Sequence, residues 1–505
     1  MPALAAAVRW TAPDGADAAS PASRYARHAP ERTLLYALVQ AHYPEFLERQ
    51  AAHDRPVPDY VRAEFDEYLR CGVLEHGFLR VVCEQCHAER LVAFSCKKRG
   101  LCPSCGARRM AESARHLVEE VFGERPVRQW VLSFPYPLRF LFASQPEALG
   151  PVLGLVQRAI AGWLADQAGV ERRAARSGAV TLIQRFGSAL NLNVHLHMLW
   201  LDGVYEERTA SNGDRIKPRL HRARAPTSAQ LTGLADTIAR RVLRHLAKRG
   251  WLEGEAESVF LSERAERDDG LDAVRMSSIT YRIATGQRAG QKVATLHTLP
   301  GDAGSLDGDA GRVGGFSLHA GVAAQAHERA KLEKLCRYIT RPAISERRLS
   351  ISPQGRVRYQ LKTPWRNGTT HVEFEPIEFI AKLAALVPPP RAHLTRFHGI
   401  FAPNANLRAQ LTAAHRGKGG KTTDTDHADD RTPEEKRRAM SWAQRLKRVF
   451  GIDVQTCQHC GGALKIVAAV EEPHAIKQIL DHFAKHGALP QAHYRPEVRG
   501  PPAAA

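Results

Sequence analysis

The 505-residue sequence lacks the features that mark membrane, secreted and nucleotide-driven proteins. It contains no run of about 18 apolar residues, so we expect no membrane span. Residues 1–9 hold no basic segment ahead of a long apolar stretch, so we expect no signal peptide and a cytoplasmic protein. Residues 417–422 resemble a phosphate loop, but His415 stands where that pattern requires glycine, and the context is polar rather than a strand. We therefore expect no ATP-driven motor.

Cysteine is scarce and unevenly placed, with six of the nine cysteines between residues 71 and 105. A secreted disulfide protein would be shorter and would spread its cysteines more widely. Two Cys-x2-Cys pairs lie here, fifteen residues apart, and two such turns can complete a tetrahedral zinc site. The predicted ligands of a structural Zn²⁺ are Cys83, Cys86, Cys102 and Cys105. Cys71 and Cys96 remain as either alternative ligands or buried cysteines.

A further Cys-x2-Cys pair, Cys457 and Cys460, lies near the C-terminal end and precedes two glycines, as in a knuckle-like turn. His482 and His486 stand one turn apart on a predicted helix and are candidates to complete a second zinc site. The alternative for this histidine pair is a solvated helix face.

Acidic residues are outnumbered, 53 against 72 Lys and Arg, which gives a net charge of +19. Such a balance favours polyanionic partners through phosphate neutralisation, although it does not separate DNA from RNA. The segment 337–366 holds eight Arg or Lys and one acid, Glu346. A nucleic acid is therefore the expected partner.

The hydrophobic pattern predicts an α+β fold. Strands are expected at 128–134, 180–187 and 193–201, the last two as an antiparallel hairpin, and helices at 146–168, 222–248 and about 322–341. The expected organisation is a disordered N-terminus at 1–30, a helical lead-in at 31–70, a zinc-binding domain at 71–112, an α+β domain at 120–345, its basic C-terminal part at 346–411, a linker at 412–440 and a CxxC region at 441–505.

The strand at 193–201 contains His195-Leu196-His197. Side chains alternate along a strand, so both imidazoles face one way, roughly 7 Å apart, and can share a divalent cation. With 23 histidines in the chain the spacing alone can arise by chance, yet two imidazoles in so apolar a strand are hard to justify structurally. In the assumed hairpin register Gln184 lies opposite His195 and is the expected third ligand, with Asp202 as the fallback.

Tyr338 lies on the predicted helix that Pro342 ends. The apolar stripe of this helix is Leu332, Leu335, Cys336 and Ile339. Tyr338 lies roughly 110° from the centre of that stripe, so it is not a core residue by position. Its basic neighbours on the helix are Lys331, Lys334 and Arg341. This face suits a nucleophile that meets a phosphate; the alternative is an ordinary tyrosine at a helix edge.

Taken together, these segments resemble the transposases of insertion-sequence family ninety-one and the related common-region elements, over roughly residues 65–480. The resemblance is carried by Ser95-Cys96-Lys97, Cys102-Pro103-Ser104-Cys105, the strand 193–199, the segments 337–342 and 390–399, and Cys457-x2-Cys460-Gly-Gly. Those proteins belong to the His-hydrophobic-His endonuclease superfamily. The resemblance implies a palm-like antiparallel sheet with flanking helices, preceded by a small zinc-ribbon-like domain and followed by a basic C-terminal region.

The resemblance also implies roles for single residues. His195 and His197 match the ligands of a catalytic Mg²⁺ or Mn²⁺, and Tyr338 matches the nucleophile. Part of that family carries two tyrosines four residues apart, whereas here Pro342 and Lys334 occupy those positions, so the chain resembles the single-tyrosine branch.

The expected function is a DNA transposase that nicks single-stranded or hairpin element ends through a 5′-phosphotyrosine, in rolling-circle transposition, with oligomerisation left open. The alternatives are a plasmid rolling-circle replication initiator or relaxase, and a non-catalytic zinc-ribbon DNA-binding regulator in which His195 and His197 are core residues.

Overall fold

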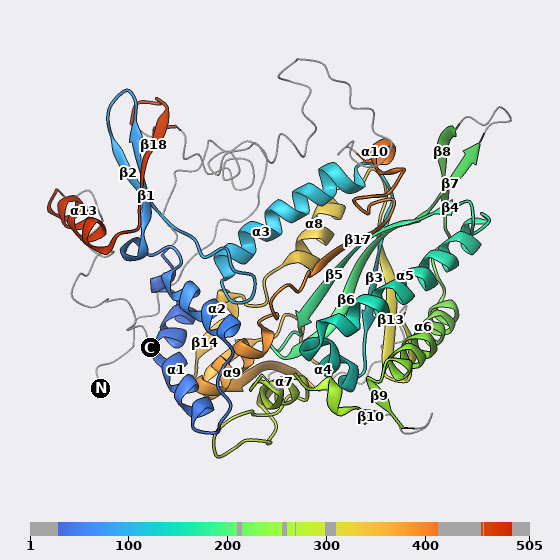
Figure 1. The fold of residues 1–505 in the computed structure, drawn as a ribbon, viewed down its shortest axis with the longest axis horizontal. Coiled ribbons are helices and arrows are strands. Elements are labelled where there is room, and N and C mark those ends of the chain that lie inside the picture. Colours follow the sequence, from blue (N-terminus) through green and yellow to red (C-terminus); the bar gives the residue numbers. More distant parts are fainter. Residues whose placement is uncertain are drawn as a thin grey trace.

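The structure, a computed structural model, describes residues 29–209, 215–254, 260–267, 269–297, 310–412, 456–457 and 459–486. The expectations for the N-terminus at 1–30 and the linker at 412–440 lie almost wholly outside these residues, as does the first part of the CxxC region. Helices and antiparallel strands alternate along the described chain, which confirms the mixed α+β class (Figure 1).

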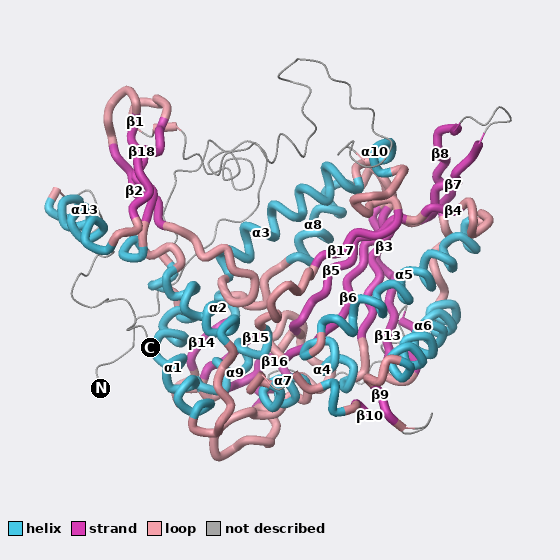
Figure 2. The backbone as a smooth tube through the Cα atoms, in the orientation of Figure 1, coloured by secondary structure: helices cyan, strands magenta, loops and turns pink. Residues whose placement is uncertain are grey.

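A six-stranded antiparallel sheet forms the centre, with the order β12-β13-β3-β6-β5-β17. Its strands are β12 (Ala310–Val313), β13 (Phe316–Ala324), β3 (Val127–Ser133), β6 (Leu192–Leu201), β5 (Gly178–Phe186) and β17 (Thr395–Gly399). Figure 2 shows α5 (Pro146–Ala168) and α6 (Ser228–Lys248) on one side of this sheet and α3 (Pro103–His116) and α8 (Arg329–Thr340) on the other.

Alternation along β6 divides its side chains between two apolar clusters. Leu196, Met198 and Trp200 are buried in the cluster that contains α5 and α6. Leu199 and Leu201 are buried in the cluster that contains α3 and α8. The odd-numbered residues of β6 therefore face α8, and the two histidines of the strand are among them.

Local sequence explains the two long helices. α5 begins at Pro146, and Gly169 in the left-handed conformation caps its end. α6 begins after a capping box made by Thr227 and Gln230. Among the described residues α5 alone is long and apolar enough to cross a membrane by length and composition, and its apolar side is buried against the sheet.

A second antiparallel sheet, with the order β11-β16-β15-β14, lies beside the first. Its strands are β11 (Ala294–His297), β16 (Thr369–Phe374), β15 (Val357–Gln360) and β14 (Leu349–Ile351), and the neighbouring helices are α1 (Leu34–Ala51), α2 (Asp59–Arg70), α4 (Tyr136–Ser144), α7 (Asp272–Ile279) and α9 (Pro376–Leu386). Short strands β4 (Ala175–Arg176), β7 (Gly203–Thr209) and β8 (Arg215–Arg222) form a projecting ribbon, β9 (Leu252–Glu253) pairs with β10 (Phe260–Leu261), and α10 (Arg408–Leu411) follows β17.

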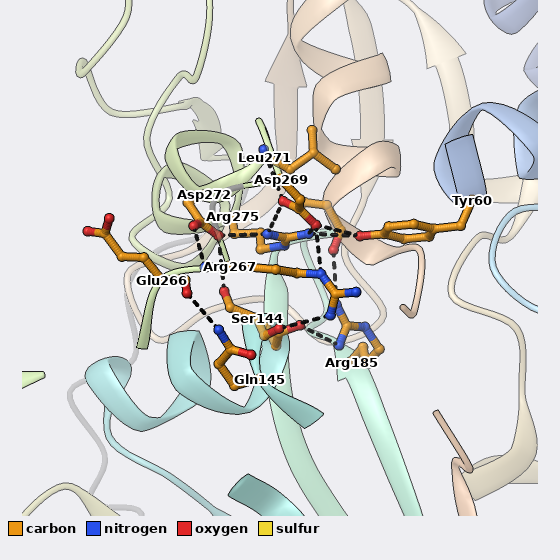
Figure 3. Close-up of polar contacts among 12 residues, drawn as sticks. Tyr60, Ser144, Gln145, Arg185, Glu266, Arg267, Asp269, Leu271, Asp272 and Arg275 are labelled. Carbon is orange, nitrogen blue, oxygen red and sulfur yellow. Dashed lines mark hydrogen bonds and ion pairs between the residues drawn. The ribbon is translucent and has the colours of Figure 1, made fainter. Parts of the chain in front are cut away.

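A buried arginine joins α7 to α2. Arg275 is 1% exposed, and its guanidinium donates to both carboxylate oxygens of Asp269, to Asp272 and to the Tyr60 hydroxyl, over 2.6–2.8 Å (Figure 3). These acids and the hydroxyl raise the pKa of Arg275 against the opposing effect of burial, which is the larger single contribution. A charge so fully partnered is a structural element.

The N-terminal cysteine segment forms a small three-stranded sheet with the order β18-β1-β2. It contains β1 (Phe78–Cys83), β2 (Glu89–Ala93) and β18 (Leu464–Val470), and α13 (Pro473–Lys485) packs against its base. In Figure 1 the blue β1 and the red β18 lie side by side, although they come from opposite ends of the chain.

The predicted elements match the observed ones closely where the contacts are local. The helix predicted at 146–168 is α5 with the same bounds, and the predicted hairpin is β5 and β6. The prediction of a helix from residue 322 is wrong at its start, because Val322 to Ala324 continue β13 and pair with β3. The prediction of a helix from 222 is wrong for the same reason, since β8 extends to Arg222 and α6 begins at Ser228.

Candidate active site

His195 and His197 come together on the α8 side of β6. Their Nε2 atoms are 3.1 Å apart, and the side chains are 8% and 4% exposed. Two nitrogens at this distance can bind one cation, because metal–nitrogen bonds of about 2.0–2.1 Å place cis ligands about 3 Å apart. The residues that the strand pattern predicted to share a face therefore do so.

The hydrogen bond of Nδ1 determines which ring nitrogen is available in His195, and in His197 the orientation of the Gln129 amide determines it. His195 Nδ1 donates to the backbone oxygen of Asn193 at 2.8 Å, which leaves its Nε2 lone pair free. His197 Nδ1 lies 2.9 Å from the side-chain amide nitrogen of Gln129 on β3. Rotation of that amide by 180° presents its oxygen to His197 Nδ1, which then donates and leaves Nε2 free.

Both imidazoles are held in the neutral form that binds metals. The pKa of His195 is lowered to about 4, mainly by burial and also by Arg341 and Arg139, while the hydrogen bond to Asn193 opposes this shift. Burial also lowers the pKa of His197 to about 2, assisted by His195 and Arg341. A bound cation would take the place of protons that the site already disfavours.

Gln184 on β5 is the cross-strand partner of His195, in the predicted register. Its amide nitrogen donates to the backbone oxygen of Ile339 at 2.7 Å, while its Oε1 atom is buried with no hydrogen-bond partner among the described residues. A buried acceptor without a donor is costly, and a cation would satisfy it. Asp202, the fallback ligand, is instead bound by Arg128 at 2.8 and 3.1 Å, so the structure removes it from the site.

Tyr338 on α8 meets this site edge-on. Its ring centroid lies 5.8 Å from that of His197, at 89°. The Arg341 guanidinium lies 4.1 Å and the Lys362 ammonium 4.0 Å from the centre of the tyrosine ring. Arg341 is fixed by a 2.6 Å hydrogen bond to the Tyr338 backbone oxygen, at the helix end that Pro342 enforces. The tyrosine is half-buried and has two cations beside it.

Of the three basic residues predicted to lie beside Tyr338, only one is described in contact with its ring. Arg341 contacts the tyrosine ring, whereas Lys331 lies 3.2 Å from Glu328 and Lys334 is exposed. Lys362 was not predicted, because it lies 24 residues beyond Tyr338 in the chain and reaches the ring through tertiary packing. Its one sequence signal is membership of the basic segment 337–366.

A cavity of about 340 Å³ opens beside the site, between α3, β5 and the end of α8. Gln184 lines it, together with four arginines: Arg99, Arg109, Arg185 and Arg341. Arg185 also lines a neighbouring cavity of about 370 Å³ with Arg267, Arg391 and Arg396. The two cavities share Arg185 and are both lined by arginines, and Gln184 lies in the lining of the first.

Arg185 contrasts with the buried Arg275 described above. It is 6% exposed and contacts three backbone oxygens at 3.3–3.4 Å, and the described residues place no carboxylate on it. Burial lowers the pKa of Arg185 to about 10. A buried cation that lines two cavities suits a site for a phosphate.

Eight of the nine cysteines form two clusters, and neither cluster is the predicted set. Cys71, Cys96, Cys102 and Cys105 lie with their sulfurs within 4.8 Å of one another, and Cys83, Cys86, Cys457 and Cys460 do the same. The prediction that joined Cys83 and Cys86 to Cys102 and Cys105 is corrected, because the hairpin of β1 and β2 carries the first pair away from α3. His482 and His486 stand outside both clusters, with rings 4.2 Å apart.

Comparison with known families finds two matches along the chain. Residues 38–134 match the model described as "Transposase zinc-binding domain" of IS91 type, and residues 178–409 match the model described as "Putative transposase". A search of curated proteins and of solved structures finds no match.

The first match contains all four cysteines of the Cys71 cluster, which supports a structural zinc ion there. The second contains β5, β6 and α8, the elements that carry Gln184, the histidine pair and Tyr338. With both domains in this order on one polypeptide, the chain is a transposase of the IS91 type.

Proposed function

We propose that this transposase cuts one DNA strand with Tyr338 as nucleophile, and that the product is a 5′-phosphotyrosine with a free 3′-OH for rolling-circle transposition. The observation that carries the proposal is the meeting of three groups at one place. Two neutral imidazoles, a buried amide oxygen without a donor and a tyrosine with two cations over its ring lie on β6, β5 and α8.

Gln184, His195 and His197 would hold a divalent cation, Mg²⁺ or Mn²⁺. Two nitrogens and one neutral oxygen leave coordination positions open for the substrate. When bound, such an ion polarises the scissile phosphate and offsets the charge that develops in the transition state. A buried Gln184 oxygen without a donor among the described residues, and two Nε2 atoms 3.1 Å apart, support a cation at this place.

The protein's own groups account for the covalent step. The Tyr338 oxygen attacks phosphorus, the bond from phosphorus to the 3′-oxygen breaks, and the phenolic proton is lost while the departing oxygen gains one. Arg341 and Lys362, at about 4 Å from the ring, stabilise the negative charge on the phenolate. The phosphotyrosine conserves the phosphodiester energy for rejoining.

The substrate we propose is single-stranded or hairpin DNA at the element ends. The net charge of +19 favours phosphate contacts, and the two cavities that share Arg185 are lined by arginines. We further propose that the central sheet with its helices is the palm-like nuclease domain of residues 120–345, that 346–411 is its basic continuation, and that the protein acts in the cytoplasm.

The test is formation of a covalent adduct that withstands SDS. Full-length protein, Mn²⁺ and single-stranded oligonucleotides from the element ends should give an adduct, and peptide mapping should find the nucleotide on Tyr338. Label on Tyr359 or Tyr281 would overturn the assignment of the nucleophile. Binding of these oligonucleotides with no adduct at any metal concentration would favour the non-catalytic regulator.

A further inference from the structure

We infer that the chain holds a second zinc ion, on Cys83, Cys86, Cys457 and Cys460, and that this ion fastens the C-terminal tail to the N-terminal zinc-binding segment. The matched zinc-binding domain ends at residue 134, so two of these four ligands lie far outside it. The inference concerns how the tail completes this four-cysteine cluster, and it does not depend on the chemistry proposed for Tyr338.

The distances between the sulfurs suit one tetrahedral ion. Cys83 Sγ lies 3.5 Å from Cys460 Sγ, and Cys86 Sγ lies 3.5 Å from Cys457 Sγ. All four sulfurs are within 4.8 Å of one another. Zinc–sulfur bonds of about 2.3 Å separate the sulfurs of a tetrahedral site by about 3.8 Å. The contacts run between the two chain ends, which fixes the site as a shared one.

The two Cys-x2-Cys turns have the same local geometry. In each, the amide groups two and three residues after the first cysteine donate to its sulfur. In each, the amide four residues on donates to the first cysteine's backbone oxygen: His87 to Cys83 at 3.1 Å, and Gly461 to Cys457 at 3.0 Å. Both His87 and Gly461 adopt positive φ, at 56° and 76°. Two matching turns that face each other are the usual frame of a four-cysteine zinc site.

Backbone pairing continues from the metal-binding turns into the sheet. β18 pairs antiparallel with β1 along its length, from Cys83 opposite Leu464 to Phe78 opposite Val470. The amide of Glu84 donates to the Ala463 oxygen at 3.0 Å, directly beside the cysteines. The four thiols are thus held in place by strand register, as well as by their own turns.

An apolar cluster beneath the sheet is also divided between the two chain ends. Leu74, Phe78 and Leu91 come from the N-terminal segment, and they are buried by four residues of the tail. The tail residues are Val470, Ile476, Leu480 and Phe483. Without the tail the first three would lose their cover, so the second zinc and this cluster stabilise the same association.

The first experiment counts zinc. Native mass spectrometry of the full chain should show two zinc ions. Cys457→Ser/Cys460→Ser should show one, Cys83→Ser/Cys86→Ser should show one, and the variant with all four substitutions should still show one, because both pairs hold the same ion. The remaining ion should disappear from the four-fold variant when Cys102→Ser/Cys105→Ser is added.

The outcomes separate this arrangement from two independent sites. One zinc in the unaltered chain, or none in the four-fold variant, overturns the inference. The matched control is His482→Ala/His486→Ala, since both histidines are exposed on α13 outside the cluster, and it should keep two zinc ions. A drop to one in this control would assign the tail cysteines to a site with these histidines instead.

A second measurement avoids cysteine substitutions that fail to fold. A specific protease site is inserted between Leu411 and Thr456 of the full chain, and the zinc-loaded protein is cut there. The tail should remain bound during size-exclusion chromatography. Separation of the tail from zinc-loaded protein at micromolar concentration overturns the inference.

Discussion

The candidate active site and the cluster of Cys83, Cys86, Cys457 and Cys460 are both built from residues that are apart in the sequence, but in different ways. Gln184 and His195 are brought together by one hairpin, whose register follows from its own turn and alternation. Cys83 and Cys460 are 377 residues apart and meet only when the whole chain has closed. The spacing of residues within a strand therefore indicates which side chains lie together. A Cys-x2-Cys spacing identifies two candidate ligands, but it does not show which other two cysteines complete the cluster.

The largest effect is expected from Tyr338→Phe, which should abolish covalent adduct formation without weakening DNA binding. Tyr338→Phe should lower adduct formation by on the order of a thousandfold or more, because the nucleophilic oxygen is lost. Zinc content and DNA affinity should stay unchanged, since the ring still packs against His197. Tyr359→Phe is the control, with a tyrosine that is 1% exposed and outside the site. An adduct of normal yield in the Tyr338 variant would remove this residue from the mechanism.

Removal of either imidazole tests whether the active site is independent of the cysteine clusters. His195→Ala and His197→Ala should each lower nicking by about a hundredfold or more, because the cation loses one of its few protein ligands. The zinc count from mass spectrometry should not change, since neither residue contacts a cysteine cluster. If both variants cut normally in limiting Mn²⁺, the pair is a buried structural feature.

A substitution in the cluster of Cys71, Cys96, Cys102 and Cys105 tests whether loss of zinc affects the candidate active site. Cys71→Ser should lose one zinc and unfold the turn that leads into α3, as seen by faster amide exchange there. Because α3 carries Arg109 into the basic cavity, we expect DNA affinity to fall by roughly tenfold, which is about one salt-dependent phosphate contact. Unchanged affinity would show that the cysteine module and the active site act separately.

Substitution of Gln129 tests whether a residue that contacts His197 supports metal binding. If it accepts the Nδ1 proton of His197, Gln129→Ala should weaken Mn²⁺ binding by about 10–100-fold, as loss of such a supporting contact does. Calorimetric titration with Mn²⁺ measures this directly. Asn193 is the wrong control because its backbone binds His195; Gln157→Ala, on the far side of the sheet against Thr181, should leave Mn²⁺ affinity unchanged.

The smallest effect is expected at Gln184. Its amide oxygen is one neutral ligand among several, so Gln184→Ala should lower Mn²⁺ affinity by only about fivefold to tenfold, or roughly 1 kcal/mol. Gln184→Glu keeps an oxygen at that position and should bind Mn²⁺ at least as tightly as the unaltered protein. Equal affinity in all three proteins would exclude Gln184 as a ligand.

The placement of several residues of the candidate active site could be predicted from the sequence, because their contacts are local or periodic. Alternation set the shared face of His195 and His197, and helical angles placed Tyr338 off the apolar stripe. Gln129 and Lys362 could not be predicted in this way. They reach the site through the pairing of β3 with β6 and through packing after α8, and no spacing in the sequence encodes either contact.

The cysteine grouping failed for a related physical reason. Cys102 and Cys105 are near in sequence to Cys83 and Cys86, but the β1–β2 hairpin moves the two pairs apart. Cys71 and Cys96 complete the cluster of Cys102 and Cys105 from positions without a Cys-x2-Cys spacing. A turn shows where two thiolates point, and tertiary structure determines which other two they meet.

The pairing of β1 with β18 has a consequence for the time at which this protein can fold. The ribosome adds about 5–20 residues per second, so the 371 residues between Cys86 and Cys457 take roughly 20–75 s to synthesise. During that interval the nascent N-terminal sheet has an unpaired edge, reduced thiols and apolar side chains awaiting a partner that does not yet exist. We expect the emerging chain to be a chaperone client until its last segment leaves the exit tunnel, and a prematurely terminated chain to remain one.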